Sequence, residues 1–394
     1  MHRLRDLRAE LLMVFGVTLF AVMGVSSIAP ALPKVVEAFG LEEAEVGLLI
    51  TAFTLPGVLL TPFAGVVADR LGRKRVLVPS LLLFGLAGGL CAFTRRLDVL
   101  LALRVVQGTG AAALGSLSTT LIGDLWEGPA RARAMGLNAS VLSLGTAVYP
   151  LVGGGLAVVG WNWPFLLPWL ALPFGVIVAR RLESPQPDGQ GDLRDYLKGA
   201  WRGLQDARVL GVFASGTLIF IILYGSYLTY FTLLLGRVFE APPHVIGAMM
   251  FIMSITTAAA SSQLGALARR FAKPTLVKAG FLAYTVSLAV VPLVREMWLL
   301  VVPVLVFGTG HGVIVPSLQT ILAELTPLEH RAIFMSLNGT MLRVGQTLGP
   351  VVMGLVFASA GYRGVFWTGS LAGVTGLLIA AATLGAGPQV CRTV

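Results

Sequence analysis

Residues 65–77 read GVVADRLGRKRVL and place five charged residues within seven positions, between two long apolar stretches. The whole chain of 394 residues is 56% hydrophobic and only 12% charged, with a mean hydropathy of +0.84. This composition is much more apolar than that of a soluble globular domain. Because lipid can cover apolar surface that water cannot, we interpret the chain as an integral membrane protein.

Apolar stretches long enough to cross a bilayer recur along the chain and predict twelve helices. No regular alternation of apolar and polar residues favours a lipid-facing barrel, and helices satisfy their own backbone groups within lipid. The basic N-terminus is followed by an apolar run of about 20 residues, which suits a first spanning helix better than a cleaved signal peptide. The expected ranges are 10–33, 45–67, 76–94, 98–122, 135–159, 163–180, 209–235, 244–267, 275–293, 297–322, 333–358 and 364–386.

Lys and Arg are distributed unequally between the two sets of loops. With the N-terminus in the cytoplasm, 21 of the 29 Lys and Arg residues lie on the cytoplasmic side and six on the opposite side. Because basic residues accumulate in cytoplasmic loops, we expect a multi-pass protein of the plasma (inner) membrane with both termini in the cytoplasm. The same bias accounts for the net charge of +10, and no basic face with interleaved aromatic residues indicates a nucleic-acid partner.

The two halves of the sequence repeat each other at a shift of 200 residues. Apolar composition alone would match scattered Leu and Val, but not polar residues, Gly and Pro in one ungapped register. The repeat predicts an all-α membrane protein of two six-helix bundles, related by a pseudo-two-fold axis along the membrane normal, with a ligand site at their seam. The matched pairs include Gly110 and Gly310, Arg131 and Arg331, Asn138 and Asn338, Gly145 and Gly345, Pro150 and Pro350, and Gly154 and Gly354.

The longest polar segment divides the chain into two domains. Residues 183–192, ESPQPDGQGD, are rich in Pro, Gly and acid and predict a flexible linker. Apolar residues at helical spacing follow, so we expect an amphipathic helix on the inner membrane surface, with an ordinary loop helix as the alternative. The predicted parts are an N-terminal bundle (1–182), a cytoplasmic linker with this helix (183–208) and a C-terminal bundle (209–394).

Three motifs resemble those of the major facilitator superfamily, and within it the twelve-helix drug:proton antiporters. Residues 65–77 match the superfamily's loop signature between its second and third helices. LALRVVQGTGAA at 101–112 resembles the fourth-helix signature, and GTAVYPLVGGGL at 145–156 resembles the fifth-helix signature of antiporters. WNWPF at 161–165 is similar to the entry of the sixth helix. The resemblance covers essentially the whole chain and implies the same two-bundle fold.

The resemblance implies that the charged loop is a conformational latch. In the superfamily the loop acid docks near the amino end of helix eleven, so Asp69 would do so here, where the helix dipole favours a negative charge. A contact that exists in one of two bundle arrangements biases the equilibrium between them. Basic residues that only anchor the loop are the alternative. The expected latch residues are Gly65, Asp69, Arg70, Gly72, Arg73 and, as a carboxylate partner for the loop cations, Asp124.

The fifth-helix motif departs from the family pattern at one position. Its glycines permit close approach of a neighbouring helix, and its proline permits a bend. Tyr149 stands where the family usually has Gly, so it either projects into the cavity or prevents the usual close packing. The expected motif residues are Gly145, Tyr149, Pro150, Gly153 and Gly154.

Basic residues lie inside the predicted spans, whereas all 19 acidic residues fall in loops or near helix ends. An embedded charge usually faces a cavity or a partner. In the family, helices four, ten and eleven border the central cavity, so we expect Arg343 and His311 to line it. A packing role for His311 and a structural tie to helix one for Arg104 are the alternatives. The expected substrate and coupling residues are Arg104, Gln107, Asn138, Tyr227, His311, Asn338, Arg343 and Gln346.

The absence of a predicted mid-membrane acid affects both coupling and substrate. Drug exporters of the family often have an acid on helix one, but this region reads GVSSIAP here. Proton coupling would therefore need His311 or a helix-end acid such as Glu37, Glu45 or Glu324. Pairing with Arg343 would favour organic anions or siderophore-like compounds.

We therefore expect a secondary active transporter that exports small amphipathic molecules by alternating access, in exchange for protons, as in multidrug or organic-anion and siderophore-like efflux. Uptake or facilitated diffusion of a small metabolite is one alternative, and a membrane enzyme or sensor is another. The sequence carries no nucleophile–base set, metal constellation or nucleotide-binding loop, so we expect no catalytic residues, metal or cofactor. The expected partners are a small-molecule substrate, protons and membrane lipid, without nucleic acid, and the protein is expected to act as a monomer.

Overall fold

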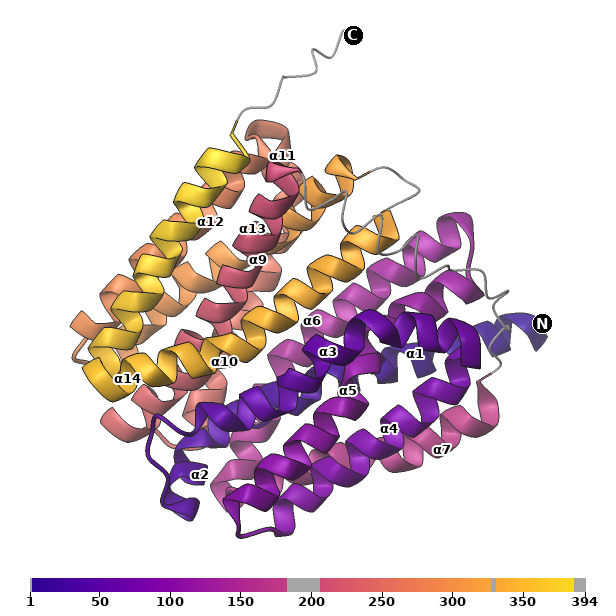
Figure 1. The fold of residues 1–394 in the computed structure, drawn as a ribbon, viewed down its shortest axis with the longest axis horizontal. Helices are drawn as coiled ribbons and strands as arrows, with labels where there is room; N and C mark the ends of the chain where they lie inside the picture. Colours follow the sequence, from indigo (N-terminus) through magenta and orange to yellow (C-terminus); the bar gives the residue numbers. More distant parts are fainter. Residues whose placement is uncertain (1, 183–205, 327–330, 386–394) are drawn as a thin grey trace, which may run out of the picture.

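The computed structural model describes residues 2–182, 206–326 and 331–385 of the chain. In these parts every regular element is a helix (Figure 1). The predicted linker and its amphipathic helix, at 183–208, lie almost entirely outside the described residues.

The first half consists of long helices joined by short connections. Pro30 and Pro33 interrupt the helix of the first span, which continues to Phe39, because each proline lacks a backbone donor. The predicted helix 10–33 is therefore divided into three elements. The elements are α1 (His2–Ser26), η1 (Ala29–Ala31), α2 (Leu32–Phe39), α3 (Gly47–Leu71), α4 (Arg73–Leu90), η2 (Cys91–Phe93), α5 (Leu97–Leu125), α6 (Gly128–Val159), η3 (Trp163–Leu170) and α7 (Ala171–Arg181).

The second half has the same plan. Its first span continues from α9 into two π-helical segments, η4 and η5, and its last element contains two helices joined at Gly361, where φ is +61° and ψ is −160°. The elements are α9 (Ala207–Ile221), η4 (Ile222–Phe231), η5 (Leu234–Val238), α10 (Pro243–Ser262), α11 (Leu264–Arg270), α12 (Lys273–Val290), η6 (Val291–Leu293), η7 (Met297–Leu300), α13 (Val301–Leu325) and α14 (Arg331–Thr383).

The helices account for the twelve predicted spans. Ten segments of the described chain are long and apolar enough to cross a membrane, and α3 contributes a shorter apolar segment at Gly47–Thr61. The segment Phe334–Thr383 holds two spans because Gly361 interrupts it. The predicted fold class, two six-helix bundles, is confirmed.

The pseudo-two-fold relation extends to individual hydrogen bonds. In the first half, the Thr61 hydroxyl of α3 donates to the carbonyl of Ala112 in α5 at 3.3 Å. In the second half, the Ser261 hydroxyl of α10 donates to the carbonyl of Gly312 in α13 at 2.8 Å. Both partners are shifted by 200 residues, so the sequence repeat corresponds to a repeat of helix packing.

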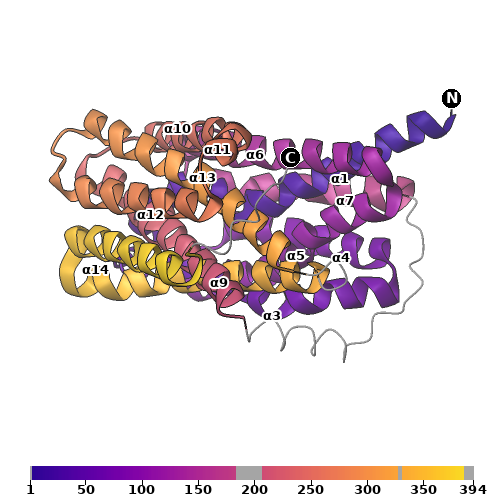
Figure 2. The same ribbon diagram turned by 90° about the horizontal axis from the view of Figure 1, so that it is seen from above.

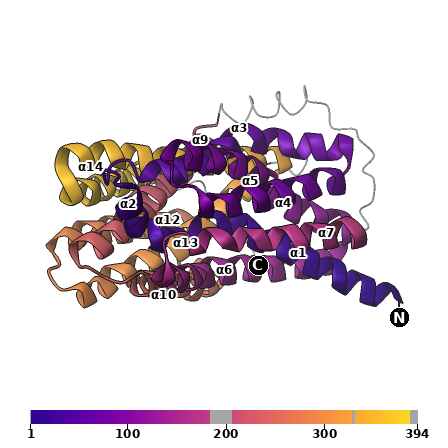
Figure 3. The same ribbon diagram turned by 90° about the horizontal axis from the view of Figure 1, so that it is seen from below.

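Each bundle has its own apolar core. One cluster is built mainly from residues 13–182, and the other mainly from residues 209–384. Figures 1 and 2 show the indigo-to-magenta half and the pink-to-yellow half on opposite sides of the molecule. Figure 3 shows α6 and α10 next to each other where the halves meet. The seam between the bundles is therefore the place to search for a ligand site.

Candidate functional site

The first seam between the halves is formed by α6 and α10, and the fifth-helix motif lies on it. A Cβ atom on Gly154 would lie 2.4 Å from the carbonyl oxygen of Pro243, and one on Gly247 would lie 2.3 Å from that of Pro150. Such distances leave no room for a side chain, so glycine allows the two backbones to touch. Gly153 makes a similar contact inside the first half, where a Cβ would lie 1.8 Å from the oxygen of Ser27.

Tyr149 does not prevent this close packing. The ring is half-buried and packs against the core of the first half. One turn earlier, a Cβ on Gly145 would lie 2.9 Å from Leu19, so α6 also packs closely on α1. The close approach to α10 begins at Pro150, directly after Tyr149.

The second seam is formed by α3 and α14. At one end, a Cβ on Gly47 would lie 2.9 Å from Pro350. One turn further, the Thr51 hydroxyl donates to the Thr347 carbonyl at 3.1 Å, and the Thr347 hydroxyl donates to that of Thr54 at 2.9 Å. The two helices are thus joined by small and hydroxyl-bearing residues, which suit close contacts in a membrane protein.

One end of the seams is closed by a polar cluster that sequence reasoning missed. Arg237 of η5 donates from Nε to Glu43 at 3.2 Å and from Nη1 to Glu37 at 3.1 Å. Tyr362 donates to the Glu43 carboxylate, and Tyr230 donates to the Glu43 backbone oxygen at 3.3 Å. We call Glu37, Glu43, Tyr230, Arg237 and Tyr362 the Glu43 cluster. It connects α2 and the loop after it to three places in the second half.

The predicted latch residues lie at the opposite end. Gly72 ends α3 with φ of +95°, a conformation that favours glycine. Arg73 donates from Nε to Asp124 at 2.9 Å, so this loop cation is bound within its own half. The repeat places a second ion pair, Lys273 with Glu324, at the corresponding positions of the other half.

The remaining latch residues are only partly described. Arg70 is exposed. The side chains around Gly65 and Asp69, and the first turn of α14, lie outside the described side chains. The docking of Asp69 at the beginning of α14 therefore stays a prediction.

Arg104 is bound in the interior of the first half. Its side chain is 1% exposed and lies over the Phe53 ring, 4.4 Å from the centroid. It donates to the carbonyls of Leu49 at 3.1 Å and Gly24 at 2.9 Å, and to the Gln107 side chain at 2.8 Å. This placement favours the structural role, because the guanidinium ties α5 to α1 and α3.

Asn138 is also bound within the first half, where its side-chain oxygen accepts a hydrogen bond from Thr18 at 2.7 Å. Like Arg104 and Gln107, it contacts α1 or the interior of its own bundle. Its repeat partner Asn338 lies in a different environment, which is described below.

Tyr227 and His311 belong to a column of nearly parallel rings inside the second half. The Tyr227 ring stacks on Phe231 at 5.1 Å and on Phe307 at 4.9 Å between centroids. Phe307 stacks on Tyr284 at 4.3 Å, and Tyr284 stacks on His311 at 6.2 Å. The Tyr284 hydroxyl also bonds to Nδ1 of His311. These contacts support the packing alternative for His311.

Arg343 lies on the seam itself. A Cβ on Gly57 of α3 would lie 3.3 Å from Cδ of Arg343, and one on Gly115 of α5 would lie 4.0 Å from its Nη2. The side chain therefore extends from α14 across two glycines of the first half. It is half-buried, and Nη1 donates to Gln346 at 3.4 Å.

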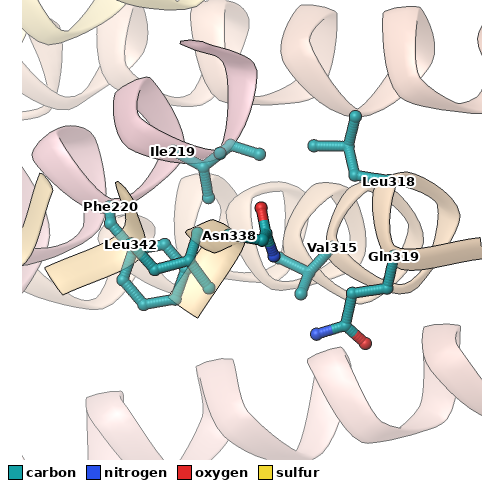
Figure 4. A pocket seen from close by; sticks show the side chains of 8 residues that line it. Ile219, Phe220, Val315, Leu318, Gln319, Asn338 and Leu342 are labelled. Carbon is teal, nitrogen blue, oxygen red and sulfur yellow. The ribbon is translucent and has the colours of Figure 1, made fainter. Parts of the chain in front are cut away.

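A small pocket, with room for about one water molecule, lies between α9, α13 and α14 (Figure 4). The polar groups in its lining are the amides of Asn338 and Gln319, and Figure 4 shows these side chains at adjacent places on the pocket wall. The lining residues are Gly216, Ile219, Phe220, Val315, Leu318, Gln319, Asn338 and Leu342.

The structure thus sorts the predicted substrate and coupling residues into three groups. The first group is bound inside the first half and consists of Arg104, Gln107 and Asn138. The second group belongs to the aromatic column and consists of Tyr227 and His311. The third group lies on α14, at the seam or the pocket, and consists of Asn338, Arg343 and Gln346.

Comparison with known proteins decides the family. The model of the Major Facilitator Superfamily matches residues 14–240 and 213–390. The chain belongs to this superfamily. As a superfamily member it is a multi-pass membrane transporter of small molecules and not an enzyme.

Two relatives illustrate its place in the superfamily. The chain is 26% identical over 364 residues to the "Bacillibactin exporter" of Bacillus subtilis (strain 168), which covers 88% of this chain and 89% of that protein. It is 24% identical over 348 residues to the "Quinolone resistance protein NorA" of Staphylococcus aureus (strain MRSA252), covering 85% and 86%.

Solved superfamily structures share the fold. The human organic anion transporter MFSD10 superposes with a TM-score of 0.69 at 22% identity, covering 95% of this chain and 99% of that one. A bacterial homolog of the human lysosomal transporter Spinster, in an inward-facing and unoccupied conformation, superposes with a TM-score of 0.79 at 14% identity, covering 95% of each chain.

Proposed function

We propose that this superfamily member is a secondary exporter that moves small amphipathic molecules out of the cell by alternating access, in exchange for protons. The name of one relative, the "Bacillibactin exporter", supports export. The observation that carries the mechanism is that the described contacts between the two bundles are concentrated at one end of both seams.

The described contacts between the halves are concentrated toward the Glu43 end. On the α3–α14 seam they run from the Glu43 cluster through Thr347 to the level of Gly57 and Arg343. On the α6–α10 seam they run from Gly154 to the hydrogen bond that Ser254 donates to the Thr146 carbonyl at 3.3 Å. This distribution supports one closed end and one end that opens.

The distribution of basic residues in the sequence indicates which side of the membrane each end faces. With both termini in the cytoplasm, the Glu43 cluster is the outer gate and the Arg73 end faces the cytoplasm. The central site is then accessible from the cytoplasm, as an exporter requires for loading. When the bundles rock, the outer gate opens and the latch end closes.

The outer gate also supplies a carboxylate for proton coupling. Glu37 is one of the helix-end acids expected to take part, and it shares Arg237 with Glu43. Protonation of these carboxylates from outside removes the charges that hold Arg237. Proton entry would thereby favour the outward-open arrangement from which substrate leaves.

Proteoliposomes with an imposed pH gradient test this function. With the interior acidic, a fluorescent amphipathic anion such as 2-naphthalenesulfonate should accumulate in vesicles that hold inverted protein, and the accumulation should collapse when a protonophore is added. Flux that ignores the gradient would contradict antiport. Accumulation with the opposite gradient polarity would favour the uptake alternative.

A further inference from the structure

The two arginines inside the spans differ in how their donors are used. A guanidinium has five N–H donors in a rigid fork. Arg104 directs its donors to two carbonyls and one amide and is 1% exposed. Arg343 makes one side-chain hydrogen bond to a described residue, at the long distance of 3.4 Å, and is half-buried. Most of its donors are therefore available to a ligand.

The helices of the first half that face Arg343 present no side chains to it. Gly57 of α3 and Gly115 of α5 leave room for the Arg343 side chain to reach the seam. Gln346 adds an amide on the next turn of α14.

The described side chains supply no counter-charge at this depth. Arg343 lies about 18 Å along α14 from Arg331, near the middle of its span, at 1.5 Å per residue. The ion pairs of the described residues lie at the helix ends, and Arg343 takes part in none of them. An embedded cation without a partner carries a desolvation cost that an anionic ligand would offset.

Apolar side chains lie on and near the same part of α14. Leu342, the chain neighbour of Arg343, and Phe220 of α9 line the small pocket together with Asn338. Asn338 lies about 7.5 Å along the helix from Arg343. These side chains would contact the apolar body of a ligand whose anionic group lies on Arg343.

We propose that Arg343, with Gln346, is the binding subsite for the carboxylate of an amphipathic aromatic anion. A carboxylate matches the guanidinium fork in a bidentate manner. The repeat position in the first half is Ser143, which bonds to its own helix at 3.0 Å, so the preference for an anion is built into one half only. The inference rests on the proposed export function, because it names the substrate class of that site.

Three ligands of one scaffold test the charge preference: 2-naphthoate, the uncharged 2-naphthamide and the cationic 2-naphthylmethylamine. Their binding to the purified full-length chain is measured by equilibrium dialysis. The parent should bind 2-naphthoate at least tenfold more tightly than the amide, and the amine most weakly. Arg343→Gln should make the naphthoate and amide affinities equal, and Arg343→Lys should retain part of the difference.

Matched variants separate the subsite from net charge and folding. Arg363→Gln removes the same charge from an exposed position and should leave the naphthoate preference unchanged. Gly57→Ala keeps the charge but places a Cβ 3.3 Å from Cδ of Arg343, and should weaken naphthoate binding severalfold. If Arg343→Gln fails to fold, Arg343→Lys and Gly57→Ala still give the result. Unchanged naphthoate preference in these variants would overturn the subsite.

The same proteins distinguish failure of the subsite from failure of the export function. Gradient-driven flux of 2-naphthalenesulfonate with no Arg343-dependent preference for naphthoate would overturn the subsite and leave export standing. An Arg343-dependent preference in a protein whose flux ignores the pH gradient would overturn the antiport function and leave the subsite standing.

Discussion

Arg237 and Glu43 join the two halves of the transporter through an Nε–Oε1 contact of 3.2 Å, although 194 residues separate them in the sequence. The same guanidinium binds Glu37, and Tyr362 donates to the same carboxylate. Because the two carboxylates belong to the first half and Arg237 and Tyr362 belong to the second, the cluster can exist only while the halves are together at this end. Substitutions in this cluster should therefore change the equilibrium between the two arrangements of the transport cycle directly.

We predict that Glu43→Gln opens the outer gate. A surface ion pair contributes about 0.2–1 kcal/mol, and a hydrogen bond to a charged group about 1.5–3 kcal/mol. We therefore expect roughly a tenfold shift toward the outward-open arrangement, since about 1.4 kcal/mol corresponds to tenfold. Spin labels at the exposed positions Glu42 and Arg363, in a background without native cysteines, should report a longer distance by electron paramagnetic resonance.

The gate prediction has a matched control at the same end of the molecule. Arg96→Gln breaks an exposed pair with Asp98 within the first half and should leave the label distance unchanged. A label distance that is the same in the parent and in Glu43→Gln would contradict the gate.

The fifth-helix glycines give a second prediction, with a control in the next residue. Gly154→Val must push the carbonyl of Pro243 away, because even a Cβ would lie 2.4 Å from it. Overpacking of this kind costs about 1–3 kcal/mol, so the α6–α10 seam should separate and transport should fall by about tenfold or more. Gly155→Val meets nothing within 4 Å and should transport at the level of the parent. Equal loss in both variants would show that bulk on α6, and not the seam, is responsible.

The contrast between the two embedded arginines predicts unequal effects of their removal on stability. Arg104→Gln leaves the carbonyls of Gly24 and Leu49 without their donor, and each hydrogen bond to a charged group is worth about 1.5–3 kcal/mol. The midpoint of thermal unfolding in detergent should fall by several degrees. Arg343→Gln, which loses one hydrogen bond of 3.4 Å, should change the midpoint little. A larger fall for Arg343→Gln would reverse the roles assigned to the two residues.

The sequence repeat predicted the two-bundle fold, and it contained more information than identical residues reveal. Arg73 and Asp124 align with Lys273 and Glu324 at the same shift of 200 residues, with the charges kept and the residue types changed. Asp124 was predicted as a partner for the loop cations, and a search for charge repeated at this shift would have predicted the second ion pair as well. Prolines likewise explain why α1 ends at Ser26 inside the first span, since Pro30 and Pro33 cannot continue its hydrogen bonds.

The contacts between the halves could not be predicted in the same way. Glu43 is one of several acids in a loop, and its partners are determined by which end of the bundle is closed. His311 lies at the depth expected of a cavity residue, but depth does not determine direction, and its ring faces Tyr284 of α12. Arg343 is at a similar depth and reaches the seam because two glycines of the facing helices leave room for it.

The latch at the cytoplasmic end gives the last prediction. The pair of Arg73 with Asp124 is satisfied within the first half, so it cannot by itself distinguish two bundle arrangements. Asp69 would do so if it docks at the beginning of α14 in the outward-open state, where the helix dipole favours an acid by about 0.3–1 kcal/mol when exposed and by more when partly buried. Asp69→Asn should therefore lower gradient-driven flux by tenfold or more while membrane insertion stays intact. Asp98→Asn makes the same chemical change at the outer end and should transport like the parent. Normal flux from Asp69→Asn would leave the loop cations with the anchoring role alone.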